Sequence, residues 1–175
     1  MNHADHMNLI KEGVSGNVWA DLGSGTGAFT LALAEILGAS GEIYSIDRDA
    51  NALKQQANSL RNQYPSTKTH LITANFTRKL EIPPLNGIVM ANSLHFHQDK
   101  SSILALIRSY LKPEGRLILV EYNTDRGNPW VPYPLSFTTW KKLSEKNGFR
   151  DTRLLASRPS RFLGEIYSAV SLNAQ

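Results

Sequence analysis

Apolar residues follow two patterns that alternate along the chain. Short, nearly continuous apolar runs predict buried strands at residues 17–22, 42–47, 69–73, 87–92 and 116–121. Between these runs, apolar residues at helical spacing predict helices at residues 5–12, 29–37, 49–64, 100–111 and 137–146. This alternation predicts a doubly wound α/β fold, in which a mostly parallel sheet carries helices on both faces.

The last part of the chain departs from this alternation. Two further apolar runs, at residues 150–156 and 163–170, have no helix between them and are joined by the turn-forming segment 157–160. Such a pair predicts a C-terminal antiparallel hairpin. The seven runs together predict a seven-stranded sheet in a single domain that covers residues 1–175.

Polar residues, glycine and proline mark several predicted element ends. Gly38 closes the second predicted helix, and Asp49 is placed to cap the third. Thr26 or Ser24 is expected to cap the helix that follows the first strand. The Lys-Pro-Glu-Gly sequence at residues 112–115 predicts a turn before the fifth strand.

A glycine-rich segment after the first strand carries the strongest functional signal. Glycine occupies every second position from Gly23 through Gly25 to Gly27, which lets a ligand lie directly on the main chain. The segment, followed by Ala28, also fits the dinucleotide fingerprint G-x-G-x-x-A. Asp21 at the strand end favours a different cofactor, because a carboxylate there attracts an ammonium group and repels a pyrophosphate.

The D-x-G-x-G-x-G spacing of residues 21–27 resembles motif I of the class I S-adenosylmethionine (SAM)-dependent methyltransferases. The resemblance spans roughly residues 16–122, with its motifs in the expected order. It implies a seven-stranded fold, SAM as cofactor with S-adenosylhomocysteine as product, and methyl transfer to oxygen, nitrogen or carbon of a small molecule. It also implies which loop residues hold the amino-acid end of SAM: Asp21, Gly23, Ser24, Gly25 and Gly27.

Three more strand ends supply the other expected cofactor-binding residues. Asp47 ends the second strand, where a carboxylate accepts hydrogen bonds from ribose hydroxyls, and Arg48 follows it beside the expected adenine. Asn75 stands where the family often has an acidic residue, but its carbonyl can still accept a hydrogen bond from adenine. Phe76 is expected to pack on the adenine face. Asn92 ends the fourth strand, where the resemblance places backbone that lines the methionine portion of SAM.

Two histidines and a glutamate are the candidate catalytic residues. His95 and His97 follow the fourth strand and Glu121 ends the fifth, and histidine exchanges protons near neutral pH. His95 is the preferred base because it lies closest to the strand end. The two histidines share one side only if their segment is extended. Their spacing matches no strong metal-binding signature, so no metal site is predicted.

Two segments outside the strands are expected to enclose the acceptor. The loop at residues 122–136 contains three prolines, and long loops in compact domains often act as lids. Its expected substrate-binding residues are Tyr122, Asn123, Trp130 and Tyr133. The N-terminal segment, residues 1–15, is expected to form a helix that closes the pocket from another side.

Composition narrows the function classes. The chain has no cysteine, which excludes disulfides, zinc–thiolate sites and thiol nucleophiles. It has neither an apolar run of about 18 residues nor a signal peptide, so we expect a cytoplasmic protein without a membrane span. The net charge of +4 is a modest basic excess. We expect a monomer or homodimer that acts on a small molecule, with no nucleic-acid partner.

Three alternative functions remain open from the sequence. The dinucleotide fingerprint allows a nicotinamide-dependent oxidoreductase. The lack of a decisive catalytic group allows a non-catalytic SAM-binding module. An RNA methyltransferase is allowed by the basic residues gathered near the C-terminus, which are Lys146, Arg150, Arg153, Arg158 and Arg161.

Overall fold

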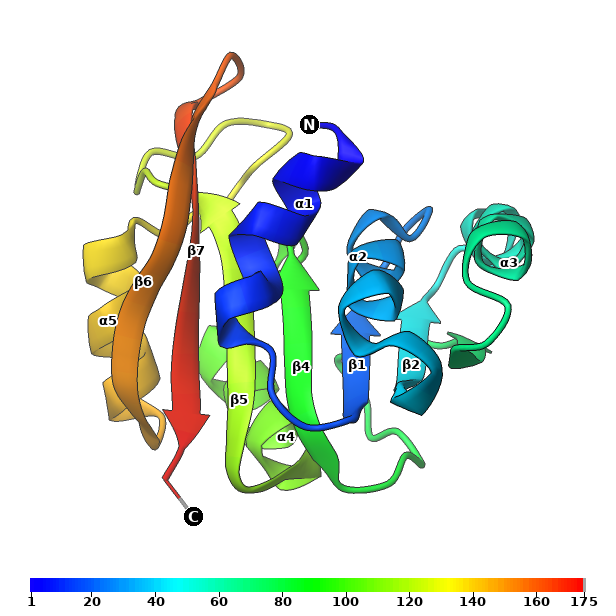
Figure 1. Cartoon of the computed structure of the whole chain (residues 1–175). Helices are drawn as coiled ribbons and strands as arrows, with labels where there is room; N and C mark the ends of the chain where they lie inside the picture. The colour runs from blue at the N-terminus through cyan, green and yellow to red at the C-terminus, as the bar shows by residue number, and fades with distance from the viewer. Residues whose placement is uncertain (175) are drawn as a thin grey trace.

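Seven strands form one sheet in a computed structural model that describes residues 1–174 (Figure 1). In chain order the strands are β1 (Val18–Leu22), β2 (Glu42–Asp47), β3 (Lys68–Thr73), β4 (Leu85–Ala91), β5 (Leu111–Tyr122), β6 (Phe149–Ser160) and β7 (Gly164–Asn173). Their order across the sheet is β3-β2-β1-β4-β5-β7-β6. The first five pair in parallel, and β7 lies antiparallel between β5 and β6. The predicted fold class is therefore confirmed.

Helices cover both faces of the sheet (Figure 1). One face carries α1 (His3–Ile10), α2 (Ala28–Leu37) and α3 (Ala50–Gln63), and the other carries α4 (Lys100–Tyr110) and α5 (Phe137–Lys146). Asp49 caps α3 as predicted, because its carboxylate accepts hydrogen bonds from two backbone N–H groups in the first turn. No helix among residues 1–174 has the length and apolar character needed to cross a lipid bilayer.

Each face of the sheet has its own apolar core. Fully buried Trp19 lies in the core shared with α1 and α2, and fully buried Trp140 of α5 lies in the opposite core. Burying a large apolar side chain stabilises the fold by roughly 1.5–3 kcal/mol. The strands of the sheet centre are therefore held from both sides, which fixes the positions of their carboxyl ends.

The largest difference from the predicted elements is at the start of β5. The expected turn at residues 112–115 lies within β5, where pairing passes from Leu85–Leu111 directly to Gly87–Arg116. The extra residues form a bulge, and Glu114 there has a φ of 60°. Leu111 already pairs with β4, so the strand begins five residues before Arg116, the predicted start.

The chain reverses its winding direction between β1 and β4. Strand β1 pairs with β2 on one side and with β4 on the other. In open α/β sheets, ligands bind beyond the carboxyl ends of the strands at such a switch point. The fold alone therefore places a ligand site next to the segment that follows Leu22.

Candidate functional site

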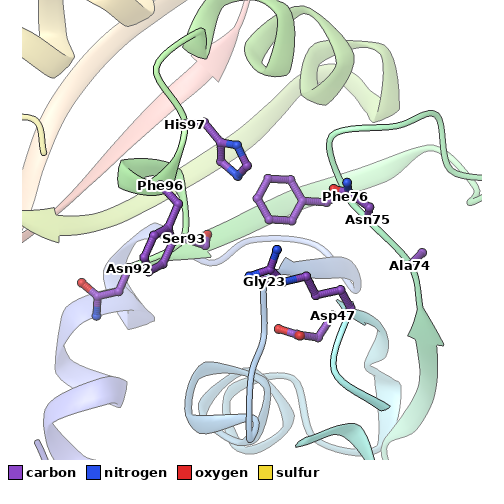
Figure 2. A pocket seen from close by; sticks show the side chains of 10 residues that line it. Gly23, Asp47, Ala74, Asn75, Phe76, Asn92, Ser93, Phe96 and His97 are labelled. Carbon is purple, nitrogen blue, oxygen red and sulfur yellow. The ribbon is translucent and has the colours of Figure 1, made fainter. Parts of the chain in front are cut away.

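A cavity of about 270 Å³ lies at this switch point (Figure 2). Its walls come from the segments that follow β1, β2, β3 and β4. The lining residues are Gly23, Asp47, Arg48, Ala74, Asn75, Phe76, Asn92, Ser93, Phe96 and His97. Seven of these ten were predicted from the sequence as site residues. Ala74, Ser93 and Phe96 were missed, although each is a direct neighbour of a predicted residue.

The glycine-rich loop is fixed at its base and open at its centre. The N–H groups of Gly23 and Ser24 both donate to the Ile46 carbonyl, at 2.8 and 3.1 Å. A Cβ on Gly23 would lie 2.6 Å from the Cβ of Ser93, so this contact requires glycine. A Cβ on Gly25 would meet no atom within 4 Å. The space above Gly25 is therefore free for a ligand that approaches the main chain.

The predicted cap of α2 is wrong. Gly27 is the N-cap residue, with a φ of 91°, and no side chain caps the helix. The hydroxyl of Ser24 instead accepts a hydrogen bond from the hydroxyl of Ser45, at 2.7 Å. Glycine adopts a left-handed conformation more easily than other residues do. The helix therefore begins at a glycine, which has no side chain to cap it.

Asp47 faces the cavity and holds the loop. One carboxylate oxygen accepts from the Gly25 N–H at 2.7 Å, and the other accepts from the Asp49 N–H at 2.8 Å. A carboxylate has about four acceptor positions, so two remain for hydroxyl groups of a ligand. Asp47 thus connects the end of β2 to the open centre of the glycine-rich loop.

The opposite part of the cavity is aromatic. The rings of Phe76 and His97 meet edge to face with centroids 5.3 Å apart, and Figure 2 shows the imidazole directed toward Phe76. Partial burial lowers the pKa of His97, and positive charges on Lys100 and Arg48 add to this effect. The side-chain oxygen of Asn75, Oδ1, accepts hydrogen bonds from the N–H and the hydroxyl of Thr77. Phe76, His97 and Asn75 thus form one wall of the cavity.

Asp21 lies behind the loop and outside the cavity lining. Its carboxyl group is almost fully buried and accepts a hydrogen bond from the Thr30 hydroxyl at 2.7 Å. Burial raises the pKa of Asp21 to about 7; the Thr30 hydrogen bond opposes this shift and the charge of Asp47 adds to it. The group is therefore poised to ionise when a cation binds nearby.

Asp21→Asn should change how stability depends on pH. Because its pKa is raised, Asp21 binds its proton more tightly in the folded state than in the unfolded chain. This difference stabilises the fold fully below about pH 4, and the stabilisation is lost as the pH rises through about 7. The free energy of unfolding of the variant, relative to wild type, should therefore increase by roughly 2–4 kcal/mol between pH 4 and pH 8. Urea denaturation at several pH values measures this difference.

Asp99→Asn is the matched control. The Asp99 carboxylate is exposed, and hydrogen bonds from Ser102 lower its pKa. Its contribution is present above about pH 4 and lost at lower pH, so the pH trend of this variant has the opposite sign. If the free energy of unfolding of wild type and of Asp21→Asn changed with pH in parallel, the raised pKa of Asp21 would be contradicted.

His95 and Glu121 form a buried pair next to the cavity. Leu94–Phe96 is a 3₁₀ turn, so the segment is not extended and the two histidines separate. The Nδ1 of His95 lies 2.7 Å from one oxygen of Glu121, whose other oxygen accepts from the His95 N–H at 3.1 Å. Glu121 is fully buried. With Glu121 ionised, Nδ1 carries the proton and Nε2 is left with a free lone pair.

The Nε2 atom of His95 is the free end of this pair. It has no hydrogen-bond partner within residues 1–174, and it is not fully buried. His97, by contrast, faces the aromatic wall of the cavity. The geometry thus gives the two histidines different surroundings, and only His95 has an acidic partner.

The loop at residues 122–136 lies beside His95. The N–H of Tyr133 donates to the His95 carbonyl at 2.9 Å, and the Tyr122 ring lies 6.3 Å from the imidazole. Trp130 is 70% exposed and Tyr133 is 41% exposed. The amide of Asn123 is occupied, because it donates to Glu165 at 2.5 Å and accepts from the Phe137 N–H. Asn123 therefore fastens the loop through these bonds, although the residue itself is exposed.

The N-terminal helix lies beside the cavity without lining it. Helix α1 packs on α2 and β6, and Asp5 forms an ion pair with Arg158. No residue from 1–15 belongs to the cavity lining. Among residues 1–174, no cluster of three histidine or acidic side chains is arranged to hold a metal ion.

Comparisons with known proteins agree with this geometry. Residues 14–158 match a family model described as a methyltransferase domain. Over 111 residues, the chain is 31% identical to the ubiquinone/menaquinone biosynthesis C-methyltransferase UbiE of Marinomonas sp. (strain MWYL1), covering 62% of this chain and 44% of that protein. The chain thus spans less than half the length of this curated relative.

Solved structures show the same fold. The CurJ carbon methyltransferase superposes with a TM-score of 0.75 at 21% identity, covering 94% of this chain and 51% of that one. The YcgJ protein of Bacillus subtilis superposes with a TM-score of 0.77 at 11% identity, covering 99% of this chain and 100% of that one. At these identities the similarity concerns the arrangement of strands and helices.

Proposed function

Because the chain belongs to the class I SAM-dependent methyltransferases, we propose that it transfers a methyl group from SAM to a carbon atom of a small-molecule acceptor. The observation that carries this proposal is the position of His95. A histidine paired with a buried glutamate lies next to a cavity whose residues suit adenosine. Such a pair is needed where the acceptor must lose a proton before it reacts.

The cavity residues suit SAM in shape and charge. Asp47 would accept the ribose hydroxyls, and Phe76 with His97 would enclose the adenine. The open space above Gly25 leaves room for the amino-acid portion, and Asp21 behind the loop would favour its ammonium group. When bound, SAM supplies a methyl group on a positively charged sulfur, which keeps the electron pair of the broken carbon–sulfur bond.

The protein's own contribution is proton removal and alignment. The acceptor carbon gives its proton to Nε2 of His95, and the electron pair left behind forms the new bond to the methyl carbon. The imidazolium that results is stabilised by the Glu121 carboxylate at 2.7 Å. Burial of this pair limits the access of water to the two side chains that handle the proton.

A carbon acceptor is supported by two kinds of observation. Carbon gives up a proton more slowly than oxygen or nitrogen of similar acidity does, so carbon methylation gains most from a positioned base. The names of the Marinomonas relative and of the CurJ structure both state methylation of carbon. The identity of the acceptor is part of the proposal for this chain.

Calorimetric titration with SAM, S-adenosylhomocysteine and NAD tests the cofactor. We expect binding of the first two and none of NAD. Isotope-labelled SAM is then offered with β-dicarbonyl and phenol acceptors, and NMR of the product identifies the methylated atom. Selective binding of NAD would replace the proposal with an oxidoreductase. Transfer to oxygen alone would contradict the choice of carbon.

Asp47→Ala should lower SAM affinity by roughly 1–3 kcal/mol, the usual loss for a charged hydrogen-bond acceptor. The carboxylate faces the cavity and also holds the Gly25 N–H, so both effects weaken binding. Asp49→Ala is the control, because Asp49 caps α3 and does not line the cavity. Equal affinities for wild type and a folded Asp47→Ala variant would remove this role.

A small-molecule acceptor remains favoured over nucleic acid. Two of the C-terminal basic residues are already paired, since Arg150 contacts Glu114 and Arg158 contacts Asp5. This leaves less unpaired positive charge for a phosphate backbone. The cytoplasmic location and the choice between monomer and homodimer stay predictions.

A further inference from the structure

Three aromatic side chains besides Tyr133 are exposed near His95. Phe96 is 56% exposed, Trp130 is 70% exposed and Phe162 is 50% exposed. Together with the half-buried Tyr122 they form what we term the aromatic strip. Soluble proteins rarely leave several aromatic rings together in water without a binding role.

The strip is continuous from the cavity to the tip of the β6–β7 hairpin. Phe96 lines the cavity, and its ring lies 4.3 Å from the His95 ring. Tyr122 lies 6.3 Å from His95 on one side and 5.7 Å from Phe162 on the other. The Trp130 ring then meets Phe162 edge to face at 6.4 Å. The candidate base therefore lies within the strip.

The strip is held in place by backbone and side-chain bonds. The N–H and the side-chain amide of Asn123 both donate to Glu165 of β7, at 2.9 and 2.5 Å. The Tyr133 N–H donates to the His95 carbonyl. Figure 1 shows the tip of the β6–β7 hairpin projecting beyond the other strands, at the end of the sheet where the β5–α5 loop lies.

We propose that the aromatic strip binds a planar, unsaturated ring of the methyl acceptor, with Phe162 as a specificity-determining residue. This inference rests on the proposed methyltransferase function. The rings of the strip meet edge to face, an arrangement that leaves ring faces free to stack on a flat apolar ligand. A ligand stacked there would lie beside His95 and next to the cavity that suits SAM.

Tryptophan gives a direct readout, because Trp19 and Trp140 are fully buried whereas Trp130 is exposed on the strip. The protein is labelled with 5-fluorotryptophan, and Trp130→Phe assigns the Trp130 fluorine signal. The probe is 2-naphthol, a flat apolar ring compound, titrated with S-adenosylhomocysteine present. Its saturated analogue decahydro-2-naphthol is the matched control ligand. We expect 2-naphthol to shift the Trp130 signal alone and the saturated analogue to shift it little.

Phe162→Ala should weaken 2-naphthol binding roughly tenfold, as expected for loss of one aromatic contact surface. Leu154→Ala is the control variant, because Leu154 is a comparably exposed apolar residue of β6 outside the strip. S-adenosylhomocysteine should bind both variants as it binds wild type, which also shows that they fold.

The possible failures are distinguishable. If S-adenosylhomocysteine does not bind wild type, the proposed function fails first. If it binds but 2-naphthol leaves Trp130 unchanged, or binds Phe162→Ala equally well, the assignment of the strip is overturned. A wild-type dimer that Phe162→Ala converts to monomers would also overturn it, because a second copy would then cover the strip.

Discussion

Gly27→Ala should lower the free energy of unfolding by roughly 2–5 kcal/mol, a large part of the 5–15 kcal/mol that holds a typical domain together. The residue has a φ of 91°, where a side chain is strained. Its new Cβ would also lie 2.3 Å from Cγ of Gln56, a fully buried side chain that would have to shift. Urea denaturation followed by circular dichroism measures the loss.

A double variant separates the two causes. Gln56→Ala removes the colliding atoms, so Gly27→Ala/Gln56→Ala should recover the steric part and keep only the backbone strain of about 1–2 kcal/mol. Gly25→Ala is the positional control, because its Cβ would meet no atom within 4 Å. It should fold with a cost of about 1 kcal/mol and yet bind SAM at least about tenfold more weakly. Equal destabilisation by both alanines would contradict this account.

His95→Gln should lower the turnover number by roughly 10²–10⁴, the usual contribution of a positioned general base. Because His95 does not line the cavity, SAM affinity should stay close to the wild-type value. His97→Gln is the matched control and should behave in the opposite way, since His97 packs on Phe76 in the cavity wall. Single-turnover rates and calorimetry, run on the same preparations, separate the two effects.

Glu121 should act through His95. Glu121→Gln is expected to lower the turnover number, and the His95→Gln/Glu121→Gln double variant should be no slower than His95→Gln alone. Additive losses would mean that the two residues act independently. A fully active His95→Gln variant would remove the proposed base and with it the argument for a carbon acceptor.

The fold was predictable because its signals are local. The buried runs that became β1 and β2, and the Asp49 cap of α3, each depend on residues close together in the chain. The bulge at residues 112–115 was not predictable in the same way. It depends on Leu111 pairing with Leu85, and such a contact leaves no mark in the local sequence.

The site was predictable where a strand ends and less so elsewhere. Asp47 and Asn92 follow strands, so the topology brings them to one cavity. The pairing of His95 with Glu121 depends on a 3₁₀ turn that the sequence pattern did not predict. A binding role for Phe162 could not be predicted from the sequence, where it is a single aromatic residue in a hairpin turn. Its contact with Trp130 is visible only in the folded chain.

The position of β7 has a consequence for how the protein forms during synthesis. Of the seven strands, the one that pairs with β5 on its second side is the last in chain order, and β6 pairs with no described strand other than β7. Until residues 164–173 emerge, β5 has an unpaired edge and the tip that carries Phe162 is not held in place. Long-range pairing of this kind slows folding and leaves an unpaired strand edge that is prone to aggregation. The end of the sheet that carries Phe162 is therefore completed only after strands β1 to β5 have emerged.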